Sequence, residues 1–395
     1  MRLSTPARLG KLGQLDTQQF LAQHWQKRPL LLRGAFADFA CPVDKAALLA
    51  LAGSPQVESR LVLERSRPAF RVEHGPFTKE RWRKLPKTHW TVLVQDVDKH
   101  LSPVADLLEA FSFLPRWRID DIMISYAARQ GGVGPHYDNY DVFLLQGLGK
   151  RRWRLGPKPK APQLLPGTEL RVLENFSPTE EIVVEPGDLL YLPPHVAHHG
   201  IAETECITLS VGFRAPSQRE LMFSWVEELL QRSADSQRYR DPDLRRVFHS
   251  GEIDKQAIAH LQALLRPALQ LDATHFARWF GRHVTEPKPQ LAKQRLPTTG
   301  PRTSPILKRA LGSRWAFLST SRHLSLFVDG VEWQLPRRLK PLVAALCDQS
   351  RVDVSRFKAV AASREFKTLQ ADLFERGLLQ ADRDVPLRRP PRRRK

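Results

Sequence analysis

The chain has 395 residues, of which 42% are hydrophobic, so it is long enough for two or three domains and too apolar to be disordered throughout. Its formal net charge of +20 suits work near a polyanion such as nucleic acid or ribonucleoprotein, although charge alone does not establish binding. The three cysteines lack CxxC spacing, which argues against a disulfide framework or a structural zinc site and fits a reducing cytoplasm. No apolar run is long enough to cross a membrane. The acid-free residues 1–15 have a composition compatible with a transit peptide, but a short exposed basic end is the preferred interpretation.

The first ninety or so residues have the pattern of short helices mixed with short strands. Residues 17–35 carry apolar side chains at helical spacing and then a short apolar run closed by glycine, which predicts a helix followed by a strand. Residues 45–51 are a second expected helix, with Asp44 placed to cap its start. Strands are expected at residues 60–63 and 90–94.

Between residues 121 and 213 the pattern becomes one short strand after another, separated by turn signals. The expected strands are 121–126, 141–146, 152–155, 181–184, 188–192 and 207–213. Strand 152–155 follows strand 141–146 at the distance of a hairpin, so these two are expected to pair. Many short strands with few helices predict a mainly β fold, either a barrel or a double-sheet jelly roll of the kind that cupins share.

After residue 216 amphipathic helices replace the strands. They are expected at residues 218–232, 255–265 and 273–282. Their apolar stripes form either the core of a helical subdomain or a dimer surface, and the intramolecular interpretation is the default. Residues 285–305 contain five prolines and little apolar content, so this stretch is a linker candidate.

A last small domain is expected beyond that linker. Residues 323–328 and 331–335 flank Asp329-Gly330, the pattern of a hairpin with a tight turn. Two helices, at residues 341–347 and 363–377, should complete a mixed domain of winged-helix size.

The positive charge is concentrated at this end of the chain. Residues 301–395 contain 21 Lys and Arg against 9 Asp and Glu, so they contribute +12 of the total +20. The last eight residues form a basic tail. A solvated face would account for a charge run, but its concentration in a terminal domain favours an acidic partner such as RNA.

His136 and Asp138 are the residues that point most directly to chemistry. They lie two apart, on one face of an extended segment, directly after a glycine-rich stretch that lets backbone approach a ligand closely. A second histidine would complete a 2-His-1-carboxylate set, which non-haem Fe(II) oxygenases use because it leaves positions open for cosubstrate and oxygen. His198 is our choice for that histidine, with His195 and His199 as alternatives. Zinc is the rival metal, but the chain shows no general-base motif such as HExxH here.

Four segments between residues 131 and 216 support this reading together. They are Gly-Gly-Val-Gly-Pro-His-Tyr-Asp-Asn-Tyr-Asp-Val-Phe at 131–143, Gly-Lys-Arg-Arg-Trp-Arg at 149–154, Glu-Pro-Gly-Asp leading to Tyr-Leu-Pro-Pro at 185–194, and Ser-Val-Gly-Phe-Arg-Ala-Pro at 210–216. They resemble the bacterial ribosomal oxygenases of the JmjC/cupin superfamily, in particular the type that 3-hydroxylates an arginine of a large-subunit ribosomal protein. The resemblance covers nearly the whole chain, in motif for the catalytic half and in layout for the rest.

The resemblance implies an organisation in successive parts and a cytoplasmic homodimer. The parts are a JmjC/cupin catalytic domain at 1–215 with its core at about 90–215, an all-α helical dimerisation region at 216–285, a linker at 286–305, a C-terminal winged-helix α+β domain at 306–387 and a basic tail at 388–395.

It also implies the cofactors. Fe(II) would be held by His136, Asp138 and His198, and 2-oxoglutarate would bind that iron, with O2 as cosubstrate. The far carboxylate of 2-oxoglutarate needs a buried cation, and the family position for it falls on Arg151, whose planar fork suits a carboxylate. Lys150 is the neighbour that remains as an alternative.

One hydroxyl residue completes the expected cosubstrate site, and one position nearby departs from the family pattern. Ser125 matches the family hydroxyl that assists in binding 2-oxoglutarate. Thr208 stands where the family often has an asparagine.

The implied activity is hydroxylation of an arginine β-carbon in a ribosomal protein, coupled to oxidative decarboxylation of 2-oxoglutarate. An arginine substrate calls for acidic and aromatic groups at the pocket mouth. The candidates are Asp120, Asp121, Tyr137, Tyr140 and Asp141. The alternatives are a JmjC histidine hydroxylase or lysine demethylase, a non-enzymatic cupin-like ribosome-associated factor, and a DNA-binding regulator built on the winged-helix domain. A protein of +20 should repel a basic ribosomal protein unless the catalytic mouth is locally acidic or the basic C-terminal domain contacts rRNA instead.

Overall fold

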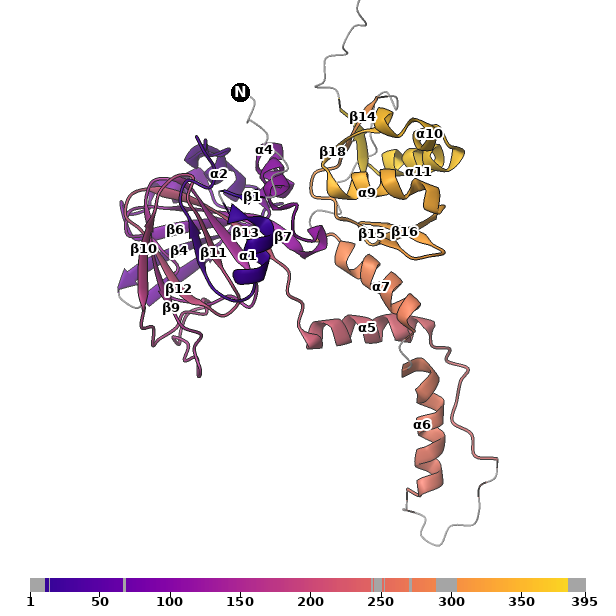
Figure 1. Cartoon of the computed structure of the whole chain (residues 1–395). Helices are drawn as coiled ribbons and strands as arrows, with labels where there is room; N and C mark the ends of the chain where they lie inside the picture. The colour runs from indigo at the N-terminus through magenta and orange to yellow at the C-terminus, as the bar shows by residue number, and fades with distance from the viewer. Residues whose placement is uncertain are drawn as a thin grey trace, which may run out of the picture.

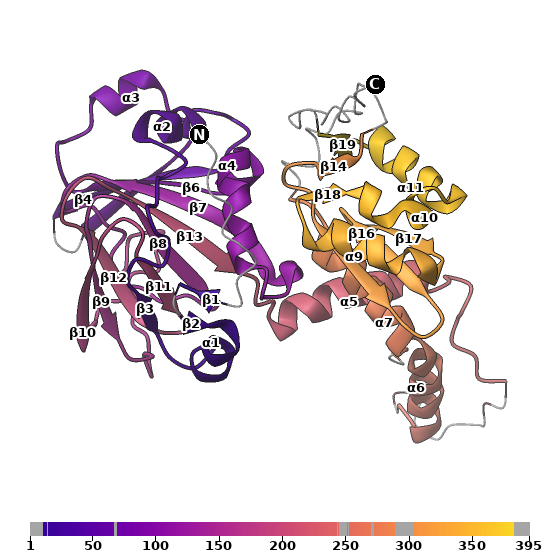
Figure 2. The same cartoon turned by 45° about the horizontal axis from the view of Figure 1, so that its top comes forward.

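The computed structural model describes residues 11–382 except 14, 67–68, 243, 245–250, 252, 270–271 and 289–303. Figures 1 and 2 show a β-rich body at the N-terminal side and a mixed α/β body at the C-terminal side. Between them in the chain come α5 (Gln218–Arg232), α6 (Lys255–Leu269) and α7 (Ala273–Thr285). Most of the expected linker and all of the expected basic tail lie outside the described residues.

The β-rich body consists of two antiparallel sheets, as expected for a jelly roll of the cupin type. Its strands are β1 (Lys11–Leu12), β2 (Leu15–Asp16), β3 (Leu30–Leu32), β4 (Ser59–Ser66), β5 (Ala69–His74), β6 (Trp90–Val94), β7 (Ile119–Ala127), β8 (Val142–Leu148), β9 (Arg151–Gly156), β10 (Glu180–Val184), β11 (Leu189–Leu192), β12 (Ala197–Ala202) and β13 (Cys206–Phe213). The large sheet has the order β3-β11-β8-β13-β7-β6-β4-β5, and the small sheet has the order β10-β9-β12. The short pair β1 and β2 stands apart from both.

Four α-helices accompany these strands in the described part of the body. They are α1 (Thr17–Gln23), α2 (Lys45–Ala52), α3 (Lys79–Arg83) and α4 (Ser102–Ala105). Asp44 caps α2 as expected, since its carboxylate accepts the amide hydrogen of Ala47 at 2.8 Å.

The expected hairpin between residues 141–146 and 152–155 is wrong. Strand β8 pairs with β11 and β13 in the large sheet, whereas β9 pairs with β10 and β12 in the small one. The connection crosses between the sheets at Gly149, whose φ is +65°. A side chain there would also meet the carbonyl oxygen of Glu205 at 2.0 Å, so only glycine fits this crossing. Hairpin spacing did not reveal the crossover because each strand finds its partners elsewhere in the chain.

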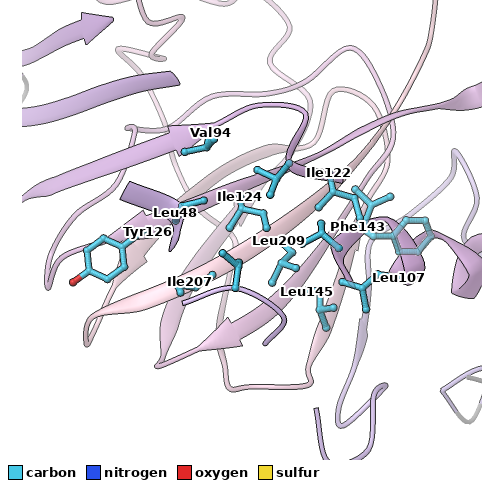
Figure 3. Close-up of a cluster of buried hydrophobic side chains, with 14 of the residues drawn as sticks. Leu48, Val94, Leu107, Ile122, Ile124, Tyr126, Phe143, Leu145, Ile207 and Leu209 are labelled. Carbon is cyan, nitrogen blue, oxygen red and sulfur yellow. The ribbon is translucent and has the colours of Figure 1, made fainter. Parts of the chain in front are cut away.

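Side-chain alternation gives the large sheet two different faces. Ile122 and Ile124 of β7, Phe143 of β8 and Leu209 of β13 lie in one buried cluster, which Figure 3 shows from close by. The residues that alternate with them along the strands, such as Met123, Ser125 and Leu144, point to the other face and line the cavity between the two sheets. The packing of this cluster therefore holds β7, β8 and β13 in place, and side chains on the other face of the same strands build the site.

The C-terminal body contains two small antiparallel sheets with helices packed on them. Its elements are β14 (Ile306–Arg309), β15 (Trp315–Ser319), β16 (Leu324–Val328), β17 (Val331–Leu335), α9 (Lys340–Asp348), β18 (Arg351–Asp353), α10 (Lys358–Ala361), α11 (Arg364–Glu375) and β19 (Leu379–Ala381). The sheets have the orders β15-β16-β17 and β18-β14-β19. The expected hairpin is confirmed as β16 and β17, and Asp329 and Gly330 at its turn have φ values of +48° and +80°.

Of the helices after the jelly roll, α7 packs on this C-terminal body and α5 packs on α7, whereas α6 extends away from it. Helix α5 has the expected bounds, and α6 and α7 begin where expected but run to Leu269 and Thr285. Trp225 of α5 packs edge-to-face against Trp279 of α7, with 5.0 Å between the ring centroids. Gly281 of α7 lies so close to Phe327 of β16 that a side chain there would come within 2.4 Å of its ring.

Charged contacts connect the two bodies directly. The Nε atom of Arg116 donates to the carbonyl oxygen of Asp348 at 2.9 Å. Lys288 and Arg314 of the C-terminal side reach carboxylates of the β-rich body, which are treated below. Within the described ranges, none of the helices has both the length and the apolar content needed to cross a membrane.

Candidate metal and cosubstrate site

His136, Asp138 and His198 converge inside the jelly roll. Each offers a ligand atom, and these atoms lie within 4.8 Å of one another. His136 follows the glycine-rich stretch, while His198 lies on β12, a strand that the sequence did not predict. The amide hydrogen of each histidine bonds to the carbonyl oxygen of the other, at 3.0 and 2.8 Å, so the backbone itself holds the two side by side.

Both imidazole rings are oriented by a backbone carbonyl. The Nδ1 atom of His136 lies 3.0 Å from the carbonyl oxygen of Gly134, and that of His198 lies 2.9 Å from the carbonyl oxygen of Val196. A proton on Nδ1 leaves each Nε2 lone pair free, and Nε2 of His198 is 3.7 Å from a carboxylate oxygen of Asp138. Burial, and then the nearby His136, lower the pKa of His198 to about 4, so its ring is neutral at physiological pH, as a metal ligand must be.

The two alternative histidines are directed elsewhere. His195 has a φ of +69° and its amide hydrogen bonds to the carbonyl oxygen of Asp138, but its ring lies near Tyr137, 5.8 Å between centroids. His199 is adjacent to His198 on β12 and therefore points to the opposite face, where its ring is 6.5 Å from that of Phe176.

Arg151 of β9 lies deeper in the same cavity and is 5% exposed. Its Nη1 donates to the hydroxyls of Ser125 at 3.3 Å and Thr208 at 3.2 Å, and its Nε has no partner. No carboxylate of the described residues forms an ion pair with it. A buried cation without a counterion is costly, so the guanidinium is suited to an anionic ligand.

The alternative cation is outside the cavity. Lys150 has a half-exposed side chain, and its Nζ pairs with Glu185 at 2.5 Å on the surface. Adjacent residues of a strand point to opposite faces, which explains why only Arg151 turns inward.

Gln146 and Trp153 belong to this site and were missed by the sequence analysis. The fully buried Gln146 accepts the Thr208 hydroxyl hydrogen at 3.0 Å, and the face of Trp153 lies 5.4 Å from the Arg151 guanidinium carbon. A polar residue within the apolar strand β8 was the signal that could have revealed Gln146.

The cavity that contains these groups has a volume of about 1070 Å³ and extends to α5 and the end of α7. Its lining is locally acidic, although the whole chain is strongly basic. The acidic residues are Glu58, Asp120, Asp121, Asp138, Glu169, Glu220 and Glu286, and the lysines and arginines are Arg60, Arg151, Arg171, Arg214 and Lys288.

Comparison with known proteins identifies the family. The JmjC domain family matches residues 106–221. The ribosomal protein uL16 3-hydroxylase of Escherichia coli (strain K12) is 39% identical over 277 residues, 70% of this chain and 73% of that one. A crystal structure of E. coli YcfD superposes with a TM-score of 0.80 at 34% identity, over 93% of this chain and 98% of that one. A structure of the E. coli ribosomal oxygenase YcfD in complex with cobalt and 2-oxoglutarate superposes with a TM-score of 0.76 at 33% identity and the same coverage.

The chain belongs to the JmjC-domain ribosomal oxygenases. The residues of this oxygenase fit the metal and cosubstrate of the family on chemical grounds. Two imidazole nitrogens and one carboxylate oxygen suit Fe(II) and leave it accessible from the cavity. The unpaired guanidinium farther in suits the second carboxylate of 2-oxoglutarate.

Four of the five residues suggested for the substrate end of this oxygenase do line the cavity. They are Asp120, Asp121, Tyr137 and Tyr140. Asp141 is the exception, because its fully buried carboxylate accepts hydrogen bonds from the Tyr191 hydroxyl at 2.6 Å and from the Gln26 amide at 2.9 Å. Its role is to tie β11 to the N-terminal segment.

Proposed function

We propose that this ribosomal oxygenase uses Fe(II) and 2-oxoglutarate to hydroxylate the β-carbon of an arginine in a large-subunit ribosomal protein. The observation that carries the proposal is one cavity with a 2-His-1-carboxylate set, a buried guanidinium that lacks a counterion, and an acidic outer lining. The E. coli relative that matches over most of both chains acts on uL16. A protein that modifies such a substrate would work in the cytoplasm.

We assign the metal to His136, Asp138 and His198. When bound, Fe(II) supplies the oxygen chemistry, in which 2-oxoglutarate is converted to succinate and carbon dioxide while a hydroxyl is added to the substrate. The chain itself keeps the His198 imidazole neutral and fixes the direction of both rings through the carbonyls of Gly134 and Val196. No side chain is required as a general acid or base.

We assign the far carboxylate of 2-oxoglutarate to Arg151. Ser125 and Thr208 hold the guanidinium from one side, and Gln146 in turn holds Thr208. The guanidinium of Arg151, which has no counterion among the described residues, then supplies its charge to the ligand carboxylate. Thr208 provides here the polar support for which the family often uses asparagine.

The outer cavity is suited to a cationic side chain. Asp121 is buried at the wall, and Tyr137 and Tyr140 add aromatic surface beside it. The excess of carboxylates in the lining also resolves the apparent conflict between a basic enzyme and a basic substrate, since the field at the mouth is set by the nearest charges.

The test is hydroxylation itself. Purified ribosomal proteins or an arginine-containing peptide would be incubated with enzyme, Fe(II) and 2-oxoglutarate, and the products sequenced by mass spectrometry. One added oxygen on an arginine is the expected result. An added oxygen on histidine, or loss of a methyl group, would identify the histidine hydroxylase or the demethylase instead. Iron binding without any substrate-dependent succinate would indicate the non-enzymatic factor.

We further propose that α5 and α6 form a homodimer surface. They expose large apolar side chains, which monomeric proteins rarely gather in one region. These are Met222, Phe223, Val226, Leu230, Ile258, Leu261, Leu265 and Leu269. Light scattering after size exclusion should give twice the chain mass for the wild type and the monomer mass for Phe223→Glu/Leu230→Glu, with Leu148→Glu in the jelly roll as the control. A wild-type monomer would refute the surface.

We also retain the winged-helix assignment and an rRNA contact for the C-terminal body. Its hairpin β16–β17 stands beside α9 and α11, and on its exterior lie basic residues that form no ion pair within the described ranges. They include Arg322, Arg337, Lys340, Lys358, Arg364 and Lys367, all exposed. RNA affinity of the wild type, measured across a salt series, should fall steeply as the salt concentration rises. The dependence of affinity on salt should become weaker when these residues are neutralised. A flat, unchanged slope would exclude the contact.

A further inference from the structure

Four carboxylates crowd together where the two bodies meet, beside the outer cavity. Asp96, Asp98 and Asp121 are each less than 9% exposed, and Asp120 lies next to Asp121 on β7. Asp121 accepts the amide hydrogen of Asp96 at 2.9 Å, and Asp98 accepts that of Ile122 at 2.8 Å. Asp120 and Asp121 also line the cavity, so this cluster is part of its wall.

Two lysines approach the cluster from different parts of the chain. Lys99, from the β-rich body, places its Nζ 2.8 Å from Asp96 and 3.6 Å from Asp98. Lys288, which follows α7, places its Nζ 2.9 Å from both carboxylate oxygens of Asp96 and 4.0 Å from Asp120. Lys288 itself lines the cavity. Lys288, from the C-terminal half of the chain, therefore supplies one of the two lysine charges that offset the carboxylates in this wall of the cavity.

We propose that Lys288 is a positioning residue of the substrate site, which keeps the carboxylate of Asp121 ionised so that a cationic substrate side chain meets a negative charge. The proposal rests on the proposed function, because it takes the substrate to be an arginine. It makes substrate recognition dependent on the segment after α7, rather than on the jelly roll alone.

The electrostatics of the cluster support this role. Burial, together with the charges of Asp96 and Asp98, raises the pKa of Asp121, while Lys99 and Lys288 oppose that rise, and the balance leaves the pKa at about 6. Arg314 and Arg214 contact Asp120, at 2.9 and 3.3 Å, so they neutralise that carboxylate of the cluster and not Asp121. The other charged or titratable groups around Asp121 are Tyr140 from the loop before β8 and Arg60, which is linked to it through Gln95. Loss of Lys288 would thus leave three buried carboxylates with Lys99 as their nearest cation, and the pKa of Asp121 would rise toward neutrality.

The direction in which the pKa of Asp121 changes determines the pH range in which peptide binding should weaken. A carboxyl group is charged above its pKa, so a higher pKa of Asp121 weakens binding of a cation only below that value. We would titrate metal-free enzyme with an arginine peptide by calorimetry from pH 6 to pH 9, using Lys288→Met, the charge-retaining Lys288→Arg, and Lys87→Met as an exposed control outside the cavity. The same peptide with citrulline in place of arginine measures the contribution of the charge.

We expect Lys288→Met to bind the arginine peptide about tenfold more weakly than wild type at pH 6.5 and within about twofold at pH 9, with Lys288→Arg and Lys87→Met close to wild type throughout. Citrulline peptide should show no such pH dependence. An equal loss at every pH, or no loss, would overturn the proposal, since the first indicates a purely structural role. Failure of the wild type to prefer arginine over citrulline would instead count against the proposed function.

Discussion

His136 and His198 are joined by two backbone hydrogen bonds, 3.0 and 2.8 Å long, and their ring centroids lie 4.3 Å apart. The bridge links a glycine-rich loop to β12, sixty residues further along the chain. Because main-chain atoms make this link, the spacing of the two rings depends on the fold and not on which metal is bound. Binding of metal and cosubstrate at this pair therefore depends on the side chains that surround it.

Replacement of His198 by alanine should lower metal affinity by more than tenfold, because it removes one of three ligands that the cavity offers. The matched control is His199→Ala, whose ring points to the other face of β12. Cobalt(II) titration followed by its visible absorption measures both variants. Equal affinities of the two variants would contradict the ligand assignment.

Replacement of Arg151 by methionine should raise the KM for 2-oxoglutarate about 10- to 100-fold, since hydrogen bonds to a charged group contribute about 1.5–3 kcal/mol. Lys150→Met, which removes only a surface ion pair with Glu185, should leave that KM unchanged. Succinate formation at varied 2-oxoglutarate gives the comparison. A larger effect from Lys150 would reverse the assignment.

Thr208→Val should raise the KM for 2-oxoglutarate several-fold and lower stability by about 1–3 kcal/mol, because it leaves the buried Gln146 oxygen without its hydroxyl donor. Thr208→Ser retains the hydroxyl and should restore the KM while losing only packing. Urea unfolding and succinate assays on the two variants separate these effects. The idea fails if the valine and serine variants have the same KM.

Gly281→Ala should lower the melting temperature of the C-terminal body, because the added methyl group meets the buried Phe327 ring at 2.4 Å. Overpacking costs about 1–3 kcal/mol, which exceeds the gain of about 1 kcal/mol that alanine brings to a helix. Gly251→Ala is the control, since its side chain would meet nothing within 4 Å. Differential scanning calorimetry should show a lower transition for the first variant alone, and an unchanged transition would mean that α7 does not pack on β16 in solution.

Local pattern was sufficient for much of the secondary structure. The Asp329-Gly330 turn, the Asp44 cap and the bounds of α5 followed from residue types and spacing, because these features depend on neighbours in the sequence. The pair His136 and Asp138 was recognisable for the same reason, since residues two apart share one side of an extended segment.

Structural features that depend on residues far apart in the sequence could not be predicted from local pattern. The separation of β8 and β9 into different sheets was missed, as was β12, a strand with few β-branched residues that is held by its pairing with β9. Burial of Asp141 and inclusion of Gln146 follow from contacts across the sheet. Residue types and short spacing thus determined two of the donors, His136 and Asp138, whereas the cation Arg151 was expected from the resemblance to the family. Only the tertiary structure decided that His198 faces His136 and Asp138. It also decided that Lys288, 150 residues beyond Asp138 in the chain, pairs with the carboxylates of the cavity wall. Both contacts depend on which chain segments the fold brings together.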